Sequence, residues 1–335
     1  MIQKKRLVSG IKPTGELTLG NYIGVLQPLL FLQKYLKNFD FYLFIADLHA
    51  LTFYQEPVQL KKQIKKVAAL YLAAGLEPEK INLFVQSEII EHSYLGYLLE
   101  CNSYFNELQR MIQYKEKSKK NNDSIRTSLF TYPTLMAADI LIYDANLVPI
   151  GQDQKQHLEL TKTLAIRFNN LYGNTFIVPE AFFNPLGTKI KSLQNPLKKM
   201  SKSKTENDKN YILLLDEPKE IKKKIMSAMT DSETIIKYDP ENKPSISNLL
   251  TIYASLKKVS MQESEKIFQL SSYKNLKDKV YEVIIEFIVP LQRKFYQLID
   301  SPQLNAILDE GAKKARFIAA YKIKEVQKKL GIARF

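Results

Sequence analysis

The chain has 335 residues, 45% of them hydrophobic, which is enough to bury a full core and to form two domains. Lys and Arg outnumber Asp and Glu by 49 to 35, a net charge of +14 that favours a polyanionic partner such as nucleic acid, although a lysine-rich proteome would give the same excess. The single cysteine, Cys101, excludes an intrachain disulfide framework or a cysteine-rich zinc site and fits a reducing cytosol, and the sequence has neither a signal-peptide pattern nor an apolar run long enough to span a membrane.

A strand-to-helix corner is predicted near the start of the chain. Four of the eleven glycines lie in residues 9–24, between the apolar pair Leu7-Val8 and an amphipathic run after Asn21. Such a corner presents backbone N–H groups and a helix N-terminus to an anion, and glycine allows a phosphate to approach closely. The spacing matches neither the dinucleotide fingerprint nor the P-loop, so an ordinary glycine-rich turn remains the alternative.

Alternating strand and helix signals follow. Residues 41–46 form an apolar run typical of a buried strand, and Asp47-Leu-His49 comes directly after it. A helix is predicted from Pro57 to a closing Gly75, and Leu83–Val85 supplies the next strand. This order predicts a parallel sheet that binds ligands beyond the carboxyl ends of its strands.

A second helical signal contains a carboxylate in apolar surroundings. Thr131 is predicted to cap this helix, with Pro133 in its first turn, and Asp139 is the one charged residue in the run that follows. A buried carboxylate needs hydrogen-bond donors. These donors could be structural, a backbone N–H or Arg126, or they could come from a ligand N–H held beside Tyr132 and Met136.

Two further segments carry polar groups in a distinctive order. A short strand, Leu147–Ile150, leads to Gly151 and to a helix predicted from Asp153 to Gly173, where a capping role alone would explain Asp153. Far downstream, Lys199-Met-Ser-Lys-Ser203 places two lysines on a loop, where they could neutralise a leaving pyrophosphate. Residues 211–335 read as amphipathic helices with basic faces, and Pro290 is expected to end or kink one of them.

The pair formed by Thr18-Leu-Gly-Asn21 and Lys199–Ser203 resembles the HIGH and KMSKS signatures of class I aminoacyl-tRNA synthetases. Residues 132–143 and 148–160 resemble the tryptophanyl-tRNA synthetase branch of that family, and residues 226–232 and 247–250 also fit it. The resemblance therefore spans nearly the whole chain.

The resemblance implies an α/β fold: a Rossmann-type catalytic domain with a parallel sheet over 1–205, and an α-helical anticodon-binding domain over 206–302. The last helix, about 303–335, is free to pack back on the catalytic domain. The implied protein is a cytoplasmic homodimer that joins L-tryptophan to tRNA(Trp) with ATP and Mg²⁺, with no metal ligand from the protein. Neither a membrane nor DNA is an expected partner.

The same resemblance implies three groups of site residues. The catalytic group is Thr18, Gly20, Asn21, Lys199, Met200, Ser201, Lys202 and Ser203. The ATP-binding group is Lys12, Pro13, Thr14, Gly20, Asn21, Gly151, Gln152, Asp153, Ile190, Lys199, Met200, Ser201, Lys202 and Ser203. The tryptophan-binding group is Asp139, as acceptor of the indole N–H, with Tyr132, Met136, His49, Gln154, Val148 and Ile150.

Three positions depart from the commoner family pattern: Lys12 replaces Gln, Gln152 replaces Glu and Lys204 replaces Asp. Lys12 could contact the amino-acid carboxylate or an ATP phosphate. Three other functions compete with the tryptophan enzyme: a tyrosyl-tRNA synthetase, a small-molecule nucleotidyltransferase with a similar turn, and a non-catalytic RNA-binding paralogue.

Overall fold

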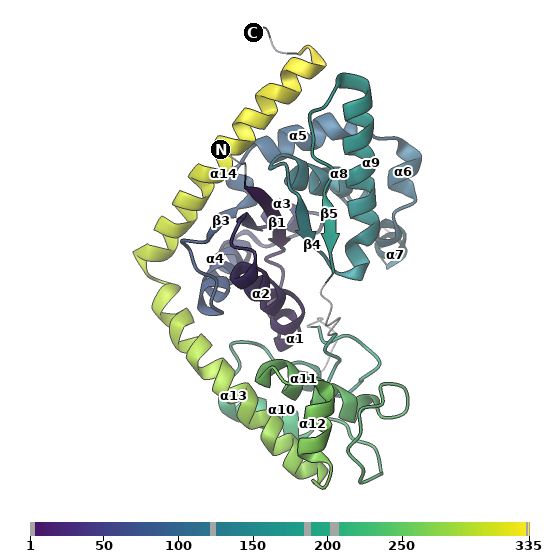
Figure 1. Cartoon of the computed structure of the whole chain (residues 1–335), viewed down its shortest axis with the longest axis vertical. Coiled ribbons are helices and arrows are strands. Elements are labelled where there is room, and N and C mark those ends of the chain that lie inside the picture. Colours follow the sequence, from purple (N-terminus) through teal and green to yellow (C-terminus); the bar gives the residue numbers. More distant parts are fainter. Residues whose placement is uncertain (1–3, 121–124, 184–188, 202–207, 333, 335) are drawn as a thin grey trace.

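A five-stranded parallel sheet forms the centre of the computed structural model, which describes residues 4–120, 125–183, 189–201, 208–332 and 334 (Figure 1). Its strand order is β3-β2-β1-β4-β5. The strands are β1 (Lys5–Ile11), β2 (Phe39–Ile45), β3 (Ile81–Val85), β4 (Leu147–Pro149) and β5 (Glu180–Phe182). The predicted parallel sheet is therefore confirmed.

The strand order reverses between β1 and β4, so these two neighbours lead their chains to opposite sides of the sheet. Ile11 at the end of β1 pairs with Ile45 at the end of β2, and both strands point the same way as β4. In a doubly wound sheet, ligands bind at the carboxyl edge beside such a reversal. The glycine-rich corner after β1 and the Gly151 corner after β4 both lie there.

Strands β2 and β3 are buried on both faces, which explains the apolar runs at residues 41–46 and 83–85. Leu7 and Leu43 belong to a core shared with α1 (Leu19–Asn21), α2 (Gln27–Tyr35) and α4 (Pro57–Ala73). Val8 and Phe44, which alternate with them, face a second core. The helices of this second core are α5 (Glu91–Glu100), α6 (Phe105–Gln109), α8 (Ser128–Leu141), α9 (Lys155–Tyr172) and α14 (Pro302–Leu330).

Helix boundaries agree with the sequence at some ends and differ at others. Helix α4 begins at Pro57 and is followed by Gly75 with a φ of +112°, as predicted. The predicted cap of α8 at Thr131 is wrong, because Thr127 precedes the helix and Pro133 lies inside it. The additional N-terminal turn buries Leu129, and this apolar contact offsets the backbone hydrogen bond that proline cannot donate.

Two other helices can be compared with their predicted boundaries. Helix α9 begins at Lys155, after a 3₁₀ turn over Gln152–Gln154, and ends before Gly173 as predicted. Of the two effects expected at Pro290, an end or a kink, the end does not occur, because helix α13 (Tyr273–Leu298) continues through the proline. Its neighbours Ile288 and Leu291 are buried, so packing holds the helix across the proline.

A helical part lies below the sheet in Figure 1. It contains α10 (Pro218–Met226), α11 (Pro244–Lys257), α12 (Met261–Phe268) and α13. The Tyr22 and Phe287 rings join it to the first corner with centroids 4.0 Å apart, and Gln27 donates a hydrogen bond to the Ser255 carbonyl oxygen (2.7 Å). The first corner is thus packed between the sheet and the helical part.

Helix α14 follows α13 and runs back along the sheet-bearing part (Figure 1). Gly311 lies against the backbone of the edge strand β3, where a Cβ atom would be 2.0 Å from the Leu83 carbonyl oxygen. The helix therefore covers the open edge of the sheet, which would otherwise offer unpaired backbone groups to another chain.

Two shorter helices remain in the sheet-bearing part of the chain. They are α3 (Asp47–Ala50), which follows β2 directly, and α7 (Ile112–Lys120). No helix in the described ranges is long and apolar enough to cross a membrane.

Candidate active site at the carboxyl edge of the sheet

The Thr18-Leu-Gly-Asn21 corner is held by reciprocal hydrogen bonds. Thr18 Oγ1 accepts from the Asn21 backbone N–H (3.2 Å), and Asn21 Oδ1 accepts from the Thr18 backbone N–H (2.9 Å). This capping box satisfies donors at the helix start and fixes its direction. Thr18 is almost fully buried, so its side chain stabilises the conformation of the corner.

The two signature segments meet in space. A Cβ atom on Gly20 would lie 3.3 Å from Met200 Cβ, so the absence of a side chain at Gly20 admits the buried Met200. Met200 donates its backbone N–H to the Ile190 carbonyl oxygen (2.9 Å), and Ile190 is also buried. Lys199 and Ser201, on either side of Met200, are exposed. Lys202 and Ser203 lie outside the described residues.

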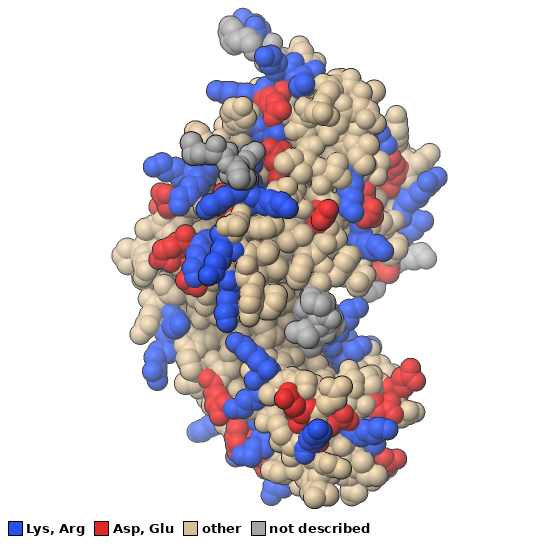
Figure 2. Space-filling model, in the orientation of Figure 1, with Lys and Arg blue, Asp and Glu red and all other residues tan. Residues whose placement is uncertain are grey.

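Asn248 of α11 anchors the base of this second segment. It accepts the Lys191 backbone N–H (2.8 Å) and donates to the Lys191 carbonyl oxygen (2.9 Å). Leu19 donates its backbone N–H to the Ile212 carbonyl oxygen (2.8 Å), which ties the first corner to the chain beyond the second segment. Both segments are thus fixed to the helical part. Figure 2 shows a notch between the two parts, with Lys and Arg side chains near its rim.

The Gly151 corner presents exposed polar side chains. Asp153 is exposed, and a Cβ atom on Gly151 would lie 2.6 Å from Asp153 Oδ1. Gln154 Nε2 donates to Asp153 Oδ2 (3.0 Å). Neither η3 (Gln152–Gln154) nor α9 begins with a side-chain cap, so helix capping does not explain Asp153. Val148 is buried in β4, and Ile150 is partly buried at the corner.

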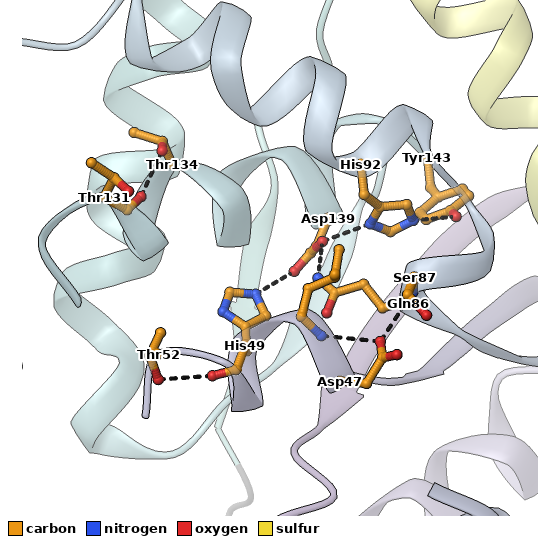
Figure 3. A network of polar contacts seen from close by, with 11 residues as sticks. Asp47, His49, Thr52, Gln86, Ser87, His92, Thr131, Thr134, Asp139 and Tyr143 are labelled. Carbon is orange, nitrogen blue, oxygen red and sulfur yellow. Dashed lines mark hydrogen bonds and ion pairs between the residues drawn. The ribbon is translucent and has the colours of Figure 1, made fainter. Parts of the chain in front are cut away.

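Asp139 is a buried carboxylate that accepts hydrogen bonds from three side chains (Figure 3). His49 Nε2 lies 2.7 Å from Oδ2, while Gln86 Nε2 (2.7 Å) and His92 Nδ1 (2.6 Å) lie near Oδ1. Arg126, the partner considered from the sequence, donates to the Leu51 carbonyl oxygen instead. The donors come from the carboxyl ends of β2 and β3 and from α5.

The charge of Asp139 is stabilised in this network. Burial alone would raise the pKa of the carboxyl group, but His49 and His92 outweigh it and lower the pKa to about 2. Oδ1 receives two hydrogen bonds and Oδ2 accepts from His49. Since a carboxylate oxygen can accept two, Oδ2 has capacity for a ligand N–H.

A second layer orients His92. Tyr143 Oη lies 2.7 Å from His92 Nε2, and burial raises the pKa of Tyr143 well above its usual value. The Tyr143 hydroxyl group therefore keeps its proton and holds the Nε2 side of the His92 ring, while Nδ1 faces Asp139. Gln86, His92 and Tyr143 are functional candidates that the sequence analysis missed. Gln86 and His92 lie 53 and 47 positions from Asp139, and Tyr143, although only one helical turn beyond Asp139, bonds His92 and not the carboxylate.

Aromatic and basic side chains lie next to this carboxylate. The rings of His49 and Tyr132 are 6.2 Å apart and nearly perpendicular, and Tyr132 Oη lies 2.7 Å from His157 Nε2. Lys12 Nζ is 5.5 Å from the centroid of the Tyr132 ring. Met136 is partly buried one turn before Asp139. The structure thus brings Lys12, directly after β1, close to His49 of α3 and to Tyr132 and Asp139 of α8.

The remaining candidates are placed by their elements. Pro13 is buried and Thr14 exposed just after β1, and Gln152 is exposed beside Asp153. Among the described residues, no group of three or more His, Cys, Asp or Glu side chains could hold a metal ion.

Comparison with known proteins shows which family shares this fold. The family model described as "tRNA synthetases class I (W and Y)" matches residues 3–289. The chain is 48% identical to the tryptophan–tRNA ligase of Bacillus subtilis over 331 residues, covering 99% of each chain. It is also similar to the structure of a tryptophanyl-tRNA synthetase from Mycoplasma pneumoniae, with a TM-score of 0.89, 36% identity and 98% of each chain covered.

A further similar structure, from Campylobacter jejuni, is a tryptophanyl-tRNA synthetase complexed with ADP and tryptophan; the TM-score is 0.82 at 33% identity, over 97% of this chain and 99% of that one. Fold and site together define a class I aminoacyl-tRNA synthetase, and the chain belongs to the family of class I tRNA synthetases for tryptophan and tyrosine. Within that family, it resembles the tryptophan enzymes along its whole length.

Proposed function

We propose that this chain is a tryptophan–tRNA ligase, which activates L-tryptophan with ATP and transfers it to tRNA(Trp). The observation that carries this proposal is the meeting of Gly20 with Met200 beside the reversal in strand order, on the same edge of the sheet as the buried Asp139 network. In this proposal, the contact between Gly20 and Met200 marks a phosphate site of the class I type. The Asp139 carboxylate supplies an acceptor for an indole N–H.

The proposed reaction has two steps. The tryptophan carboxylate attacks the α-phosphorus of ATP, and pyrophosphate leaves with the electrons of the broken P–O bond. A hydroxyl of the terminal tRNA ribose then attacks the activated carbonyl, and AMP leaves. No covalent enzyme intermediate is needed, so positioning and neutralisation of phosphate charge supply most of the acceleration.

Asp139 accepts the indole N–H in this proposal. Tyr132, Met136 and His49 enclose the ring, and Gln154, Val148 and Ile150 close its other side. Lys12 stands beside the Tyr132 ring, where its ammonium group can reach the amino-acid carboxylate or the α-phosphate as they approach each other. A lysine there adds a positive charge to a position where the family more commonly has a neutral residue.

ATP binds in the same proposal between the two corners. Pro13, Thr14, Gly20 and Asn21 contact it from the first corner, and Gly151, Gln152 and Asp153 contact it from the second. Ile190 packs near the adenosine, and Lys199 to Ser203 bind the phosphates, with Thr18 supporting the corner. Mg²⁺ enters bound to ATP as part of the substrate and needs no side-chain ligand.

Lys202→Ala is expected to slow tryptophan-dependent ATP–pyrophosphate exchange by about 10²-fold or more, because the variant lacks a positive charge that offsets the negative charge developing on the leaving pyrophosphate. Affinity for tRNA(Trp), measured by filter binding, should stay within about two-fold, since one contact among many phosphate contacts carries little of it. Lys61→Ala, at an exposed position on α4 with the same charge change, serves as the control. Unchanged exchange kinetics in Lys202→Ala would remove the catalytic role given to this lysine.

Domain roles and assembly belong to the same proposal. Residues 1–205 are the catalytic domain and 206–302 the anticodon-binding domain, with the last helix packed back on the former, in a cytoplasmic homodimer. Exposed aromatic side chains on α5 and α6, Tyr97, Tyr104 and Phe105, support a contact between two copies. Sedimentation of the purified chain should give twice the chain mass; a monomer would contradict the homodimer.

The proposed function is tested by charging. The purified chain, ATP, Mg²⁺ and labelled tryptophan should form an alkali-labile ester on a tRNA(Trp) transcript and none on a transcript that lacks the terminal adenosine. Binding of the transcript without any charging would favour the RNA-binding paralogue instead.

A further inference from the structure

The turn that ends α8 is held by two cations, the partly buried Arg6 and the buried Lys322. Asp144 has a φ of +48°, a left-handed conformation that is uncommon for a residue with a side chain, although Asp adopts it more readily than most. Arg6 of β1 donates from Nη1 to the Tyr143 carbonyl oxygen (2.9 Å). Lys322 of α14 places Nζ 2.8 Å from Asp144 Oδ1. The backbone at Tyr143 is therefore fixed from the sheet and from the last helix.

Lys322 is 4% exposed, which is unusual for an ammonium group. Besides Asp144, it donates to the Thr175 carbonyl oxygen (2.8 Å) and pairs with Glu325 (2.8 Å). A buried charge is tolerated only when it is paired, so the two ion pairs and the hydrogen bond to Thr175 define the position of this ammonium group closely. The contact therefore fixes where α14 meets the end of α8.

Tyr143 transmits this position to the amino-acid pocket. Its hydroxyl group bonds His92, which bonds Asp139 Oδ1, and its ring stacks on Tyr42 with centroids 4.7 Å apart. The same helix α14 also reaches the segment between Gln86 and His92, because Arg316 Nη2 donates to the Glu88 carbonyl oxygen (2.6 Å). Two of the three donors to Asp139 thus depend on the seating of α14.

We propose that Lys322 is a positioning residue for tryptophan recognition: through the Asp144 turn, Tyr143 and His92, it sets the place and orientation of the Asp139 carboxylate. This inference rests on the proposed function. It adds a residue on the last helix, outside the substrate site, to those that determine amino-acid affinity.

The test is Lys322→Met, which keeps the length of the side chain and removes its charge. The KM for tryptophan in ATP–pyrophosphate exchange should rise by about 10-fold, the usual scale for a residue that orients a binding group from behind. The KM for ATP and kcat should change by less than about two-fold, because the phosphate site lies elsewhere. Lys322→Arg should restore most of the affinity, and Lys324→Met, an exposed lysine on the same helix, should have no effect.

Asp144→Asn provides a second route to the same contact. It should raise the KM for tryptophan as Lys322→Met does, and the double variant should be no worse than the more affected single variant. Thermal unfolding is followed for every variant, and if Lys322→Met does not fold, Asp144→Asn and Lys322→Arg decide. An unchanged KM for tryptophan, or an equal loss for tryptophan and ATP, would overturn the inference. Failure of the wild-type chain to bind tryptophan would instead overturn the proposed function.

Discussion

Asp139→Ala is expected to lower kcat/KM for tryptophan in ATP–pyrophosphate exchange by about 10²- to 10³-fold, the usual cost of removing one partner of a buried charged hydrogen bond. It should also reduce discrimination against phenylalanine, which the intact site can hold at roughly 10⁴-fold, because an amino acid without an N–H would no longer leave a lone pair of Asp139 Oδ2 without a donor. The measurement is exchange with tryptophan and phenylalanine side by side.

The same substitution should lower the free energy of unfolding by about 3 kcal/mol, since His49, Gln86 and His92 lose their common acceptor. Asp139→Asn, which keeps one acceptor oxygen and the shape, should have a smaller effect on both properties. A folded Asp139→Ala protein with the original KM for tryptophan and the original selectivity would contradict the role of this carboxylate.

The pH dependence follows from the direction of the Asp139 shift. Because the pKa of the folded state is lowered to about 2, the ionised carboxylate stabilises the fold above its unfolded pKa near 3.8 and loses this contribution as pH falls towards 2. Asp139 thus stays charged throughout an ordinary assay range of about pH 6 to 9. Changes in selectivity within that range would have to come from other groups.

Gly311→Ala is expected to destabilise the protein by about 3 kcal/mol, although alanine is the better helix former by about 1 kcal/mol. The added Cβ atom would lie 2.0 Å from the Leu83 carbonyl oxygen and 2.9 Å from the Leu83 nitrogen. Both are backbone atoms of β3 that cannot rotate away, so α14 would have to lift off the sheet edge. Urea unfolding gives the free energy directly.

Lys313→Ala, at an exposed position two residues further along α14, is the matched control and should leave the free energy of unfolding within about 0.5 kcal/mol. A Gly311→Ala protein as stable as the wild type, or more stable, would mean that helix propensity outweighs the contact with β3. The close packing of α14 on the sheet edge would then be wrong.

Most of the sheet could be predicted from the sequence because strands buried on both faces are largely apolar, but the short edge strand β5, with its exposed Glu180, shows no such signal. Residues 41–46 and Leu83–Val85 show the apolar pattern clearly. Gly75 and Gly173 mark helix ends for a different local reason, which is the positive φ that glycine adopts readily. The start of α8 could not be predicted, and the sequence left open whether α13 ends or bends at Pro290, because burial of Leu129, Ile288 and Leu291 outweighs the local preference of proline.

The candidate site was only partly predictable. The apolar surroundings of Asp139 indicated a buried carboxylate, but whether its donors were structural or belonged to a ligand stayed open. The structure supplies structural donors, and they lie 47 to 90 positions away in sequence, at His92, Gln86 and His49. Parallel topology brings the ends of β2 and β3 together, and only the fold reveals which side chains meet there.

The decisive measurement is amino-acid-dependent ATP–pyrophosphate exchange, run on the purified chain with tryptophan, tyrosine and phenylalanine in parallel. We expect exchange with tryptophan and none above background with phenylalanine or tyrosine. Exchange driven by tyrosine would contradict the assignment of the pocket, and no exchange with any of the three would contradict the assignment of the reaction.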